Sequence, residues 1–461
     1  MFKGENGMTD MTPDLPPPED EKTNFLKELL RNENSEDWSE RIEDLHPADF
    51  ADQFEQLSND SRQDLITLDP NLISADILAE LEDEVVEDIL PYLPSGQIAE
   101  ALTELDSDDA TQIFEEMEDE QREEILEVLE PEDRANLEAS LAFDDETIGR
   151  LMQREFVAAP SFWSVGDTID HMRATGENLP DLFYNIWVVD TRFHPLGYIP
   201  VSVLMRSPRE TLLSTLMDDQ IITIEQNMDQ EEAAYIFEKY HLISAPVLDE
   251  DGRIKGIMTA DDIIDIIQDE NKEDMLALAG VTDAGLTDTA FSTVRARAPW
   301  LMLNLMTAIL ASLVIAFFDY TIDQFVQLAI LMPIVASMGG NAGTQALAVA
   351  VRSLAERDLT PQNAWRAIRR EAFAALINGF MFALVLAMIS LIWFGRQDIA
   401  IVAFIAMIIN HFFAGIAGIS IPLTLKRFGL DPAVSSSVFV TTVTDIIGFL
   451  AFLGFAALML L

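Results

Sequence analysis

Five long runs of apolar residues occupy the last third of the chain and predict membrane-spanning helices. Each begins after residue 298 and is long enough for the roughly 20 residues that a helix needs to cross a bilayer. The predicted spans are about 299–318, 326–351, 372–394, 399–425 and 433–460. Residues 299–461 are therefore expected to form an α-helical transmembrane domain with five spans.

Residues 25–150 carry a different pattern, in which Leu and Ile recur every three or four positions between carboxylates. Examples are "LISADILAELEDEVVEDIL" and "DEQREEILEVL". This spacing predicts short amphipathic helices, and Pro, Ser or Asp stands where most of them would begin. Such units stack into a small all-α superhelical domain, in which no catalytic constellation is visible.

Residues 152–270 contain an internal repeat with a period of 59. "WVVDTRFHPLGYIPVSVL" (187–204) aligns with "PVLDEDGRIKGIMTADDI" (246–263). Each copy predicts a strand, a turn, a second strand and a helix, and "DEDG" supplies the turn of the second copy. We therefore expect two α/β domains in tandem, 151–214 and 215–274, followed by a connecting helix over 275–298.

Charge divides the chain between these regions. The sequence has 80 Asp and Glu against 28 Lys and Arg, a formal net charge of −52. Residues 291–461 hold 8 acidic and 10 basic residues, which leaves 72 acidic and 18 basic residues for positions 1–290. A soluble acidic region thus precedes the membrane domain. Its negative surface argues against a nucleic-acid partner and makes metal cations the natural counter-ions.

Composition excludes further classes of function. Without cysteine the chain forms no disulfide, zinc–thiolate site or thiol catalyst. Residues 1–24 lack an apolar signal core, and their Pro-rich acidic composition predicts a disordered tail. No nucleophile–base pair, glycine-rich phosphate loop or metal–histidine motif is present, so we do not expect an enzyme.

Basic residues alternate between the two sides of the predicted spans. Five arginines lie in the connection 352–371, two more precede the first span, and Lys426 and Arg427 follow the fourth. The connections 319–323 and 395–398 hold a single Arg between them. The positive-inside rule therefore places the N-terminal region in the cytoplasm and the C-terminus on the periplasmic or extracellular side.

Two of the predicted spans carry a stripe of polar and small residues. The stripe of the second span consists of Pro333, Ser337, Asn341, Gln345 and Ala348, and that of the last consists of Ser437, Thr441, Asp445 and Gly448. Gly339, Gly340 and Gly343 remove side chains beside the first stripe, and Gly340 is grouped with its lining residues. Small residues alone favour close helix packing. The stripes therefore allow either a packed interface or the lining of a polar pathway.

Asp445 is the only acidic residue within the five spans. At about 1.5 Å per residue it lies roughly 18 Å along its helix, near the bilayer midplane, and Asn341 lies at a comparable depth. A charged group there costs at least about 2.5–3.5 kcal/mol, and no Lys or Arg is placed to pair with it. We interpret Asp445 as part of a water-filled cation pathway. A hydrogen-bonded structural role is the alternative.

A dense series of carboxylates follows the second repeat in "DDIIDIIQDENKEDMLALAG" (261–280). Because the acids fall one to four residues apart, several share a helical face and repel one another. A divalent cation with oxygen ligands would relieve that repulsion. An exposed acidic helix in an acidic protein explains the same spacing.

The 59-residue repeat resembles a tandem pair of CBS modules (cystathionine-β-synthase type). The second copy follows the family pattern closely, whereas the first reads "GYIPVSV" in place of the "GxxTxxD" end. The resemblance implies that this motif can hold an adenosine nucleotide such as ATP, and Thr259 and Asp262 are the matching positions. With one intact copy, nucleotide binding and a purely packing and dimerising role both stay open.

"PIVASMGGNAGTQALAVAVRSL" (333–354), followed by "SSSVFVTTVTDIIGF" (435–449), makes the chain resemble the MgtE family of bacterial magnesium channels. The resemblance covers nearly the whole chain and implies an N domain, a CBS pair, a plug helix and five spans in the bacterial inner membrane. It also implies a homodimer with one pore, in which Asp445 of both copies faces one ion and Asn341 completes the ring. Mg²⁺ gives up water reluctantly, so carboxylates spaced for the hydrated ion could bind and release it.

The resemblance further implies that cytosolic Mg²⁺ bridges carboxylates of the N domain, CBS pair and plug helix, and so closes the pore. The matching positions are Asp108, Asp229, Glu231, Asp262, Asp265, Glu270, Glu273 and Asp274. His241 stands where the family pattern has an acid, so one sensor site is expected to be weaker or absent.

The leading hypothesis is therefore a Mg²⁺-selective channel that cytosolic Mg²⁺ closes. One alternative is a divalent-cation transporter coupled to Na⁺ or H⁺; the lack of a second intramembrane carboxylate argues against a proton relay, whereas His411 keeps it open. The other is a non-transporting CBS-based membrane sensor, which would tolerate loss of Asp445. Selectivity among Mg²⁺, Co²⁺, Ni²⁺, Mn²⁺ and Ca²⁺ is not predicted.

Overall fold

The computed structural model describes residues 26, 45–176, 179–180, 182–281, 290–434 and 436–461. The predicted tail over 1–24 and part of the predicted connecting helix, residues 282–289, lie outside the described residues. The chain forms two compact units, Met1–Ile267 and Gln268–Leu461.

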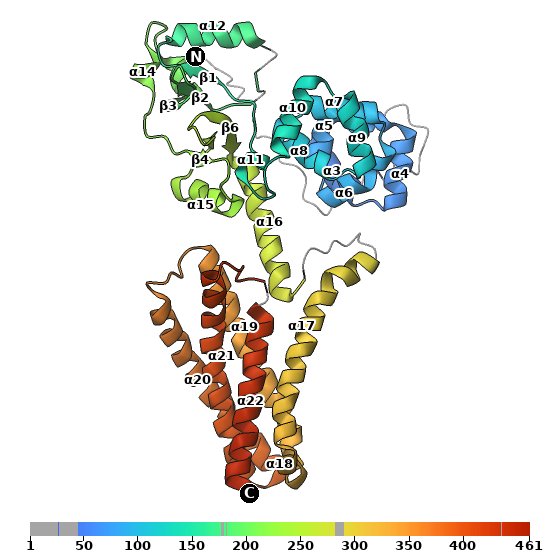
Figure 1. Cartoon of the computed structure of the whole chain (residues 1–461), viewed down its shortest axis with the longest axis vertical. Coiled ribbons are helices and arrows are strands. Elements are labelled where there is room, and N and C mark those ends of the chain that lie inside the picture. Colours follow the sequence, from blue (N-terminus) through green and yellow to red (C-terminus); the bar gives the residue numbers. More distant parts are fainter. Residues whose placement is uncertain (1–25, 27–44, 177–178, 181, 282–289, 435) are drawn as a thin grey trace, which may run out of the picture. The chain divides into compact units, whose positions relative to one another are not determined.

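Short helices occupy residues 47–140 of the first unit (Figure 1). Their apolar faces meet in one core, as the three- and four-residue spacing predicts. Phe50, Phe54, Leu65, Ile89 and Ile98 are among its fully buried side chains. The helices are α3 (Pro47–Glu55), α4 (Asn59–Leu68), α5 (Ala75–Ala79), α6 (Asp83–Ile89), α7 (Ser95–Glu104), α8 (Ser107–Glu115), α9 (Asp119–Val128) and α10 (Pro131–Ser140), with 3-10 turns at Pro70–Leu72 and Leu90–Tyr92.

Two three-stranded sheets follow in the same unit, each with a parallel and an antiparallel pair of strands. The strands are β1 (Ala158–Pro160), β2 (Asn185–Val189) and β3 (Pro195–Pro200) in one sheet, and β4 (Ile224–Glu225), β5 (Ser244–Leu248) and β6 (Ile254–Thr259) in the other. The helices are α11 (Ile148–Leu151), α12 (Val165–Thr175), α13 (Val201–Arg206), α14 (Leu213–Leu216), α15 (Gln230–Tyr240) and α16 (Ala260–Ala279).

The 59-residue repeat appears directly in the strand register. Val188 pairs with Gly197 in the first sheet, and Val247 pairs with Gly256 in the second. Asn185 donates a hydrogen bond of 3.0 Å from Nδ2 to Oγ of Ser244, its equivalent 59 residues later. The degenerate first copy therefore keeps the backbone pairing of the intact second copy, although its "GxxTxxD" end is lost.

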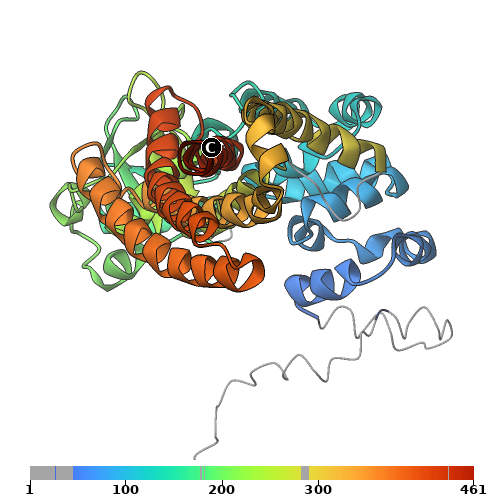
Figure 2. The ribbon, with the colours of Figure 1, turned by 90° about the horizontal axis from the view of Figure 1, so that it is seen from below.

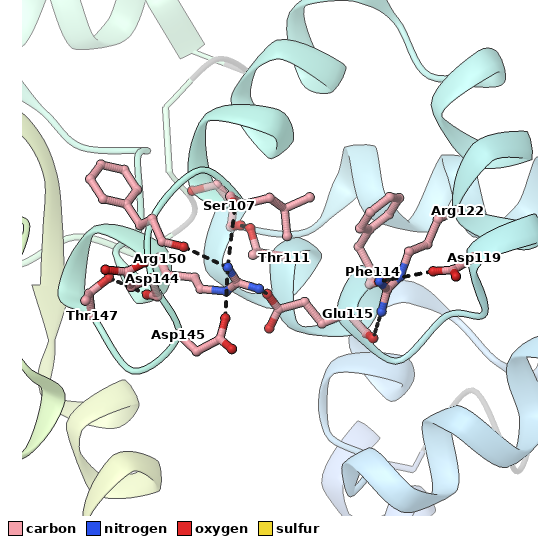
Figure 3. A network of polar contacts seen from close by, with 12 residues as sticks. Ser107, Thr111, Phe114, Glu115, Asp119, Arg122, Asp144, Asp145, Thr147 and Arg150 are labelled. Atoms are coloured by element: carbon pink, nitrogen blue, oxygen red, sulfur yellow. Dashed lines mark hydrogen bonds and ion pairs between the residues drawn. The ribbon is translucent and has the colours of Figure 1, made fainter.

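The Arg150 side chain ties helix α8 to the segment that leads into β1 (Figure 3). Arg150 of α11 forms ion pairs with Glu115 of α8 and, at 3.1 Å, with Asp145. Nearby, the backbone N–H of Arg154 donates to Ser107 Oγ at 2.8 Å, and the N–H of Ser107 donates to a carboxylate oxygen of Glu155 at 3.1 Å. The beginning of α8 is thus held in place by the residues that precede the first sheet.

Six helices follow residue 289 in the described part of the second unit: α17 (Ala290–Phe317), α18 (Asp319–Gln324), α19 (Gln327–Ala355), α20 (Ala364–Phe394), α21 (Gln397–Arg427) and α22 (Ser436–Leu460). Five of these, all except α18, are long and apolar enough to cross a membrane. The spans occur where the apolar runs predict them, although α20 starts eight residues before the predicted 372. Its first turns, "AWRAIRRE", are helical but basic, so hydropathy alone does not include them.

Helix α21 is the centre of the membrane unit and packs against α19, α20 and α22 (Figure 2). Small residues bring these helices together: a Cβ on Gly415 would lie 2.7 Å from that of Ala375, and one on Gly418 would lie 2.6 Å from that of Ala346. Close approach through small residues is the common way for helices to pack within a bilayer. Helix α17 packs mainly against α22 and leaves most of its surface exposed.

Candidate ion pathway and acidic cavity

The polar stripe of the second span lies on the surface of α19 that no other described residue of the second unit covers. Pro333, Ser337, Asn341 and Gln345 are all exposed. The opposite face is buried through Leu331, Val335, Gly339, Gly343 and Ala346, among other residues. An exposed polar stripe on a helix of the membrane unit needs water or a second protein surface, since hydrocarbon satisfies no polar group.

Asp445 has no partner within the chain. Its carboxylate is half-buried on α22 and forms no hydrogen bond or ion pair with any residue that the structure describes. Ser437 and Thr441, one and two turns before it, are half-buried as well, and the Thr441 hydroxyl donates to the Ser437 carbonyl oxygen at 2.9 Å. The carboxylate therefore keeps its lone pairs free for a cation or its water shell.

The glycines of the two stripes do not share one environment. A Cβ on Gly340 would meet nothing within 4 Å, which places this glycine on the open face of α19 with Asn341. Gly448, which the sequence pattern groups with Asp445, is buried against the Asn410 side chain of α21. The pattern could not make this distinction, because a residue three positions from Asp445 can face either a pore or a neighbouring helix.

The end of α16 contacts the helices that carry the stripes. Ala277 is buried in a cluster with Leu347 and Val351 of α19 and with Val440 of α22; Ala433, just before α22, completes it. The C-terminal turns of α16 thus cover one end of the α19–α22 pair.

In the first unit, carboxylates from the helical N domain and from the start of α16 line one cavity of about 270 Å³. Three of the predicted sensor residues, Asp108, Asp262 and Asp265, lie together there. Among the described residues, Glu80, Asp106, Asp109 and Asp261 also line it, and the sequence interpretation missed these four. The signal for Asp109 was present in "SDDAT", where it directly follows Asp108.

Burial and mutual repulsion raise the pKa of carboxyl groups in this cavity. Burial, and then the charge of Asp262, raise the pKa of Asp108 well above its usual range. The same two causes raise the pKa of Asp109 from 3.8 to about 7. One oxygen of Asp108, Oδ1, is buried and accepts no hydrogen bond. Such a group of carboxylate oxygens is chemically suited to Mg²⁺.

The remaining predicted sensor residues do not join this cavity. Asp229 caps α15 by accepting the backbone N–H of Glu231 at 3.0 Å. Glu270, Glu273 and Asp274 lie farther along α16, in the second unit. Among the residues that the structure describes, no three Asp, Glu or His side chains converge as metal ligands. His241, the departure from the family pattern, ends α15 in the left-handed conformation with φ 54°.

Thr259 and Asp262, the predicted nucleotide-binding positions, are hydrogen-bonded to each other. Asp262 Oδ2 accepts both the hydroxyl and, at 3.2 Å, the backbone N–H of Thr259. Both residues line the acidic cavity, together with Tyr184 and Trp187. A second cavity of about 450 Å³ is lined by Tyr184, Tyr198, Tyr240 and His241, among other residues, and its described lining residues include no Asp or Glu.

Known proteins share this combination of domains. Over 318 residues the chain is 30% identical to the magnesium transporter MgtE of Enterococcus faecalis, an alignment that covers 69% of this chain and 70% of that protein. The chain belongs to the MgtE family. It is also 29% identical over 441 residues to the magnesium transporter MgtE of Thermus thermophilus, covering 94% of this chain and 98% of that protein.

Family models match the separate regions. The MgtE model, described as a divalent cation transporter, matches residues 332–455; the MgtE intracellular N domain matches 45–146, and the CBS domain matches 213–269. A crystal structure of the cytosolic domain of the Mg²⁺ channel MgtE in complex with ATP is 28% identical, with a TM-score of 0.49, and covers 52% of this chain and 98% of that chain. The predicted family and fold class are confirmed.

The pH dependence of the protein's stability tests for charge repulsion in the acidic cavity. Because the pKa of Asp109 is raised to about 7 in the folded state, the folded protein holds a proton that the unfolded chain releases near pH 4. Stability without divalent cations should therefore fall as pH rises from about 4 to 7. Asp109→Asn should flatten this dependence and stabilise the protein at pH 8 by about 1 kcal/mol or more, since one pKa unit corresponds to about 1.4 kcal/mol.

Thermal melting of the full-length protein in EDTA, from pH 5 to 8, checks this expectation. Asp119→Asn is the matched control, because the Asp119 side chain is fully exposed and should leave the pH dependence unchanged. A melting temperature for Asp109→Asn at or below that of the unmodified protein at pH 8 would contradict the repulsion.

Proposed function

We propose that this MgtE-family protein is a Mg²⁺-selective channel that imports Mg²⁺ as a homodimer. The observation that carries the proposal is the unpartnered Asp445 carboxylate on α22, together with the exposed stripe of α19 that contains Asn341. Two copies that meet along these helices would cover both stripes and enclose a polar path. Mg²⁺ passing through it is the substrate, and its charge compensates the two carboxylates.

The chemistry of Mg²⁺ favours this arrangement over a tight, dehydrating site. The ion requires octahedral oxygen geometry and loses water slowly, so protein sites usually leave it several waters. Carboxylates from two copies of Asp445 can accept hydrogen bonds from those waters, and the Asn341 amide can orient them. Such outer-shell binding is strong enough to select a divalent ion and weak enough to release it.

We further propose that cytosolic Mg²⁺ closes the channel through the acidic cavity. Bound Mg²⁺ would neutralise Asp108, Asp262 and Asp265 and so hold the N domain against the CBS pair. Depletion of the ion would restore their repulsion. Helix α16 supports this coupling, because it carries Asp262 near its start and Ala277, which packs against α19 and α22, near its end. Asp229, Glu231, Glu270, Glu273 and Asp274 are proposed as further sensor ligands.

The proposed location is a bacterial inner membrane, with the N domain in the cytoplasm and the C-terminus outside. The match to an intracellular N domain supports the first part. The five arginines between residues 352 and 370, at the end of α19, the start of α20 and between them, support the second, together with Lys426 and Arg427 at the end of α21.

Mg²⁺ influx into proteoliposomes tests the pore. Asp445→Asn should lower influx at least about tenfold, because an amide removes the charge that attracts a divalent ion. Asp358→Asn, an exposed change of the same kind in the connection after α19, should leave influx unchanged. Influx should follow the membrane potential and need no Na⁺ or H⁺ gradient.

Three outcomes would change the proposed function or the role of Asp445. Influx that survives Asp445→Asn would give Asp445 a structural role. Influx that appears only with a Na⁺ or H⁺ gradient would favour a coupled transporter, although His411 stacks on Phe382 of α20 and contacts no carboxylate among the described residues. No influx under any condition would favour the non-transporting sensor.

The sensor is tested by varying Mg²⁺ on the cytosolic side. Asp108→Asn should raise the concentration that halves influx by about tenfold, equivalent to about 1.4 kcal/mol of lost binding. Asp119→Asn, exposed on α9, should not change it. An unchanged half-inhibitory concentration for Asp108→Asn would exclude the acidic cavity as the sensor and leave the pore assignment intact.

A second candidate function is nucleotide binding by the CBS pair. It is favoured by Thr259 and Asp262, which line a cavity beside the aromatic rings of Tyr184 and Trp187. Equilibrium titration of the full-length protein with ATP should give a Kd that Thr259→Ala raises about 3–10-fold, the value of one hydrogen bond. Thr215→Ala, an exposed change, is the control. Binding that instead depends on Tyr240 would move the site to the second cavity, and no binding would leave a packing module.

A further inference from the structure

A buried amide lies between the two helices that carry the polar stripes. Asn410 of α21 is 0% exposed, and its Nδ2 donates a hydrogen bond of 2.8 Å to the carbonyl oxygen of Val335 on α19. The other amide atom, Oδ1, is buried and has no hydrogen-bond partner. Asn410 thus links α21 to α19 through its donor alone.

Two glycines make room for this amide. A Cβ on Gly339 of α19 would lie 2.1 Å from Asn410 Nδ2, and a Cβ on Gly448 of α22 would lie 2.7 Å from the same atom. Real Cβ atoms do not approach so closely, so any larger residue at either position would displace the amide or the helix. The amide therefore fills a notch that α19 and α22 form together.

The notch lies directly behind the stripe residues. Gly339 and Asn341 are two positions apart, about 200° around an α-helix, so they lie on opposite faces of α19. The exposure of the two residues agrees, since Gly339 is buried and Asn341 is exposed. Gly448 is one turn from Asp445 on α22. A shift of the amide would move both helices where they carry Asn341 and Asp445.

The unpartnered oxygen argues against a purely space-filling role. A buried acceptor without a partner is unfavourable, and a leucine of similar shape would fill the notch without that cost. The asparagine therefore gains its advantage from the bond that its donor makes to α19. Ser390 of α20 provides a contrast: it is also 0% exposed with an unpartnered hydroxyl, but it lies where α20 packs against α21.

We propose that Asn410 is a positioning residue of the pore, which sets the separation and rotation of α19 and α22 and thereby the placement of Asn341 and Asp445 toward the ion. The inference rests on the proposed pore function. It adds a residue from α21, a helix that contributes nothing to either polar stripe.

The first test compares Asn410→Leu, Ser390→Ala and Asp445→Asn in proteoliposomes. The measured quantities are the half-saturating external Mg²⁺ concentration and the ratio of Mg²⁺ to Ca²⁺ influx, together with the melting temperature. For Asn410→Leu we expect the half-saturating concentration to rise about tenfold and the Mg²⁺ preference to fall. Ser390→Ala should leave both transport quantities unchanged, whatever its effect on melting.

The second test uses the steric fit of the notch. Gly339→Ala should lower both the melting temperature and influx, because its Cβ collides with the amide. Combining it with Asn410→Ala removes the collision, so the double variant should regain the melting temperature but not the Mg²⁺ preference, since the hydrogen bond is still missing. Gly454→Ala on α22, whose Cβ would be 3.9 Å from the nearest atom, is the control for a helix glycine.

The outcomes separate the two proposals. If Asp445→Asn abolishes influx while Asn410→Leu matches Ser390→Ala in affinity and ion preference, the positioning role is wrong and the pore assignment stands. If Asp445→Asn transports normally, both are overturned. If Asn410→Leu does not fold, the comparison of Gly339→Ala with the Gly339→Ala, Asn410→Ala double variant is decisive. A double variant that does not regain the melting temperature would show that the amide does not fill the notch as proposed.

Discussion

An ionised carboxylate within a bilayer must have a counter-charge, and much of this structure can be understood from that constraint. Asp445 receives none from its own chain in the part that the structure describes. Apolar faces of α19, α21 and α22 pack tightly through glycine and alanine, whereas no described residue of the second unit covers the polar side of α19. A cation as substrate and a second copy as partner, both proposed above, would supply the charge and the surface that this unit lacks by itself.

The acidic cavity of the first unit also holds carboxylates that need a counter-charge, although it lies outside the membrane unit. Its carboxylates are brought together by folding, and burial raises the pKa of Asp108 and Asp109 instead of leaving water to screen them. At low pH protons neutralise such a group, and at neutral pH a divalent cation is the natural substitute. Strongly bound, fixed ligands would suit a structural metal. Repelling carboxylates from two parts of the chain suit a reversible sensor better, because removing the ion weakens the contact that it supports.

Periodicity along the sequence was sufficient to predict the fold. It was not sufficient to predict which neighbouring helix each face of a membrane helix contacts. The apolar runs predicted five spans, and the 59-residue repeat predicted two sheets whose registers match residue for residue. Both follow from local pattern. By contrast, Gly448 could not be distinguished from a pore-lining glycine, and Asn410 belongs to neither of the two polar stripes that the sequence pattern singles out. Their roles depend on which helices are neighbours, and that information lies in the packing of α21 against two other helices.

The buried polar groups of the membrane unit suggest why small residues are so frequent there. A channel for a hydrated ion needs side chains held at a fixed distance, and apolar packing alone permits helices to slide and rotate. Glycine at positions 339 and 448 allows one amide to contact both α19 and α22, and its hydrogen bond to Val335 is directional where dispersion is not. Packing supplies the cohesion of the bundle, and this buried polar contact supplies the register that an ion pathway requires.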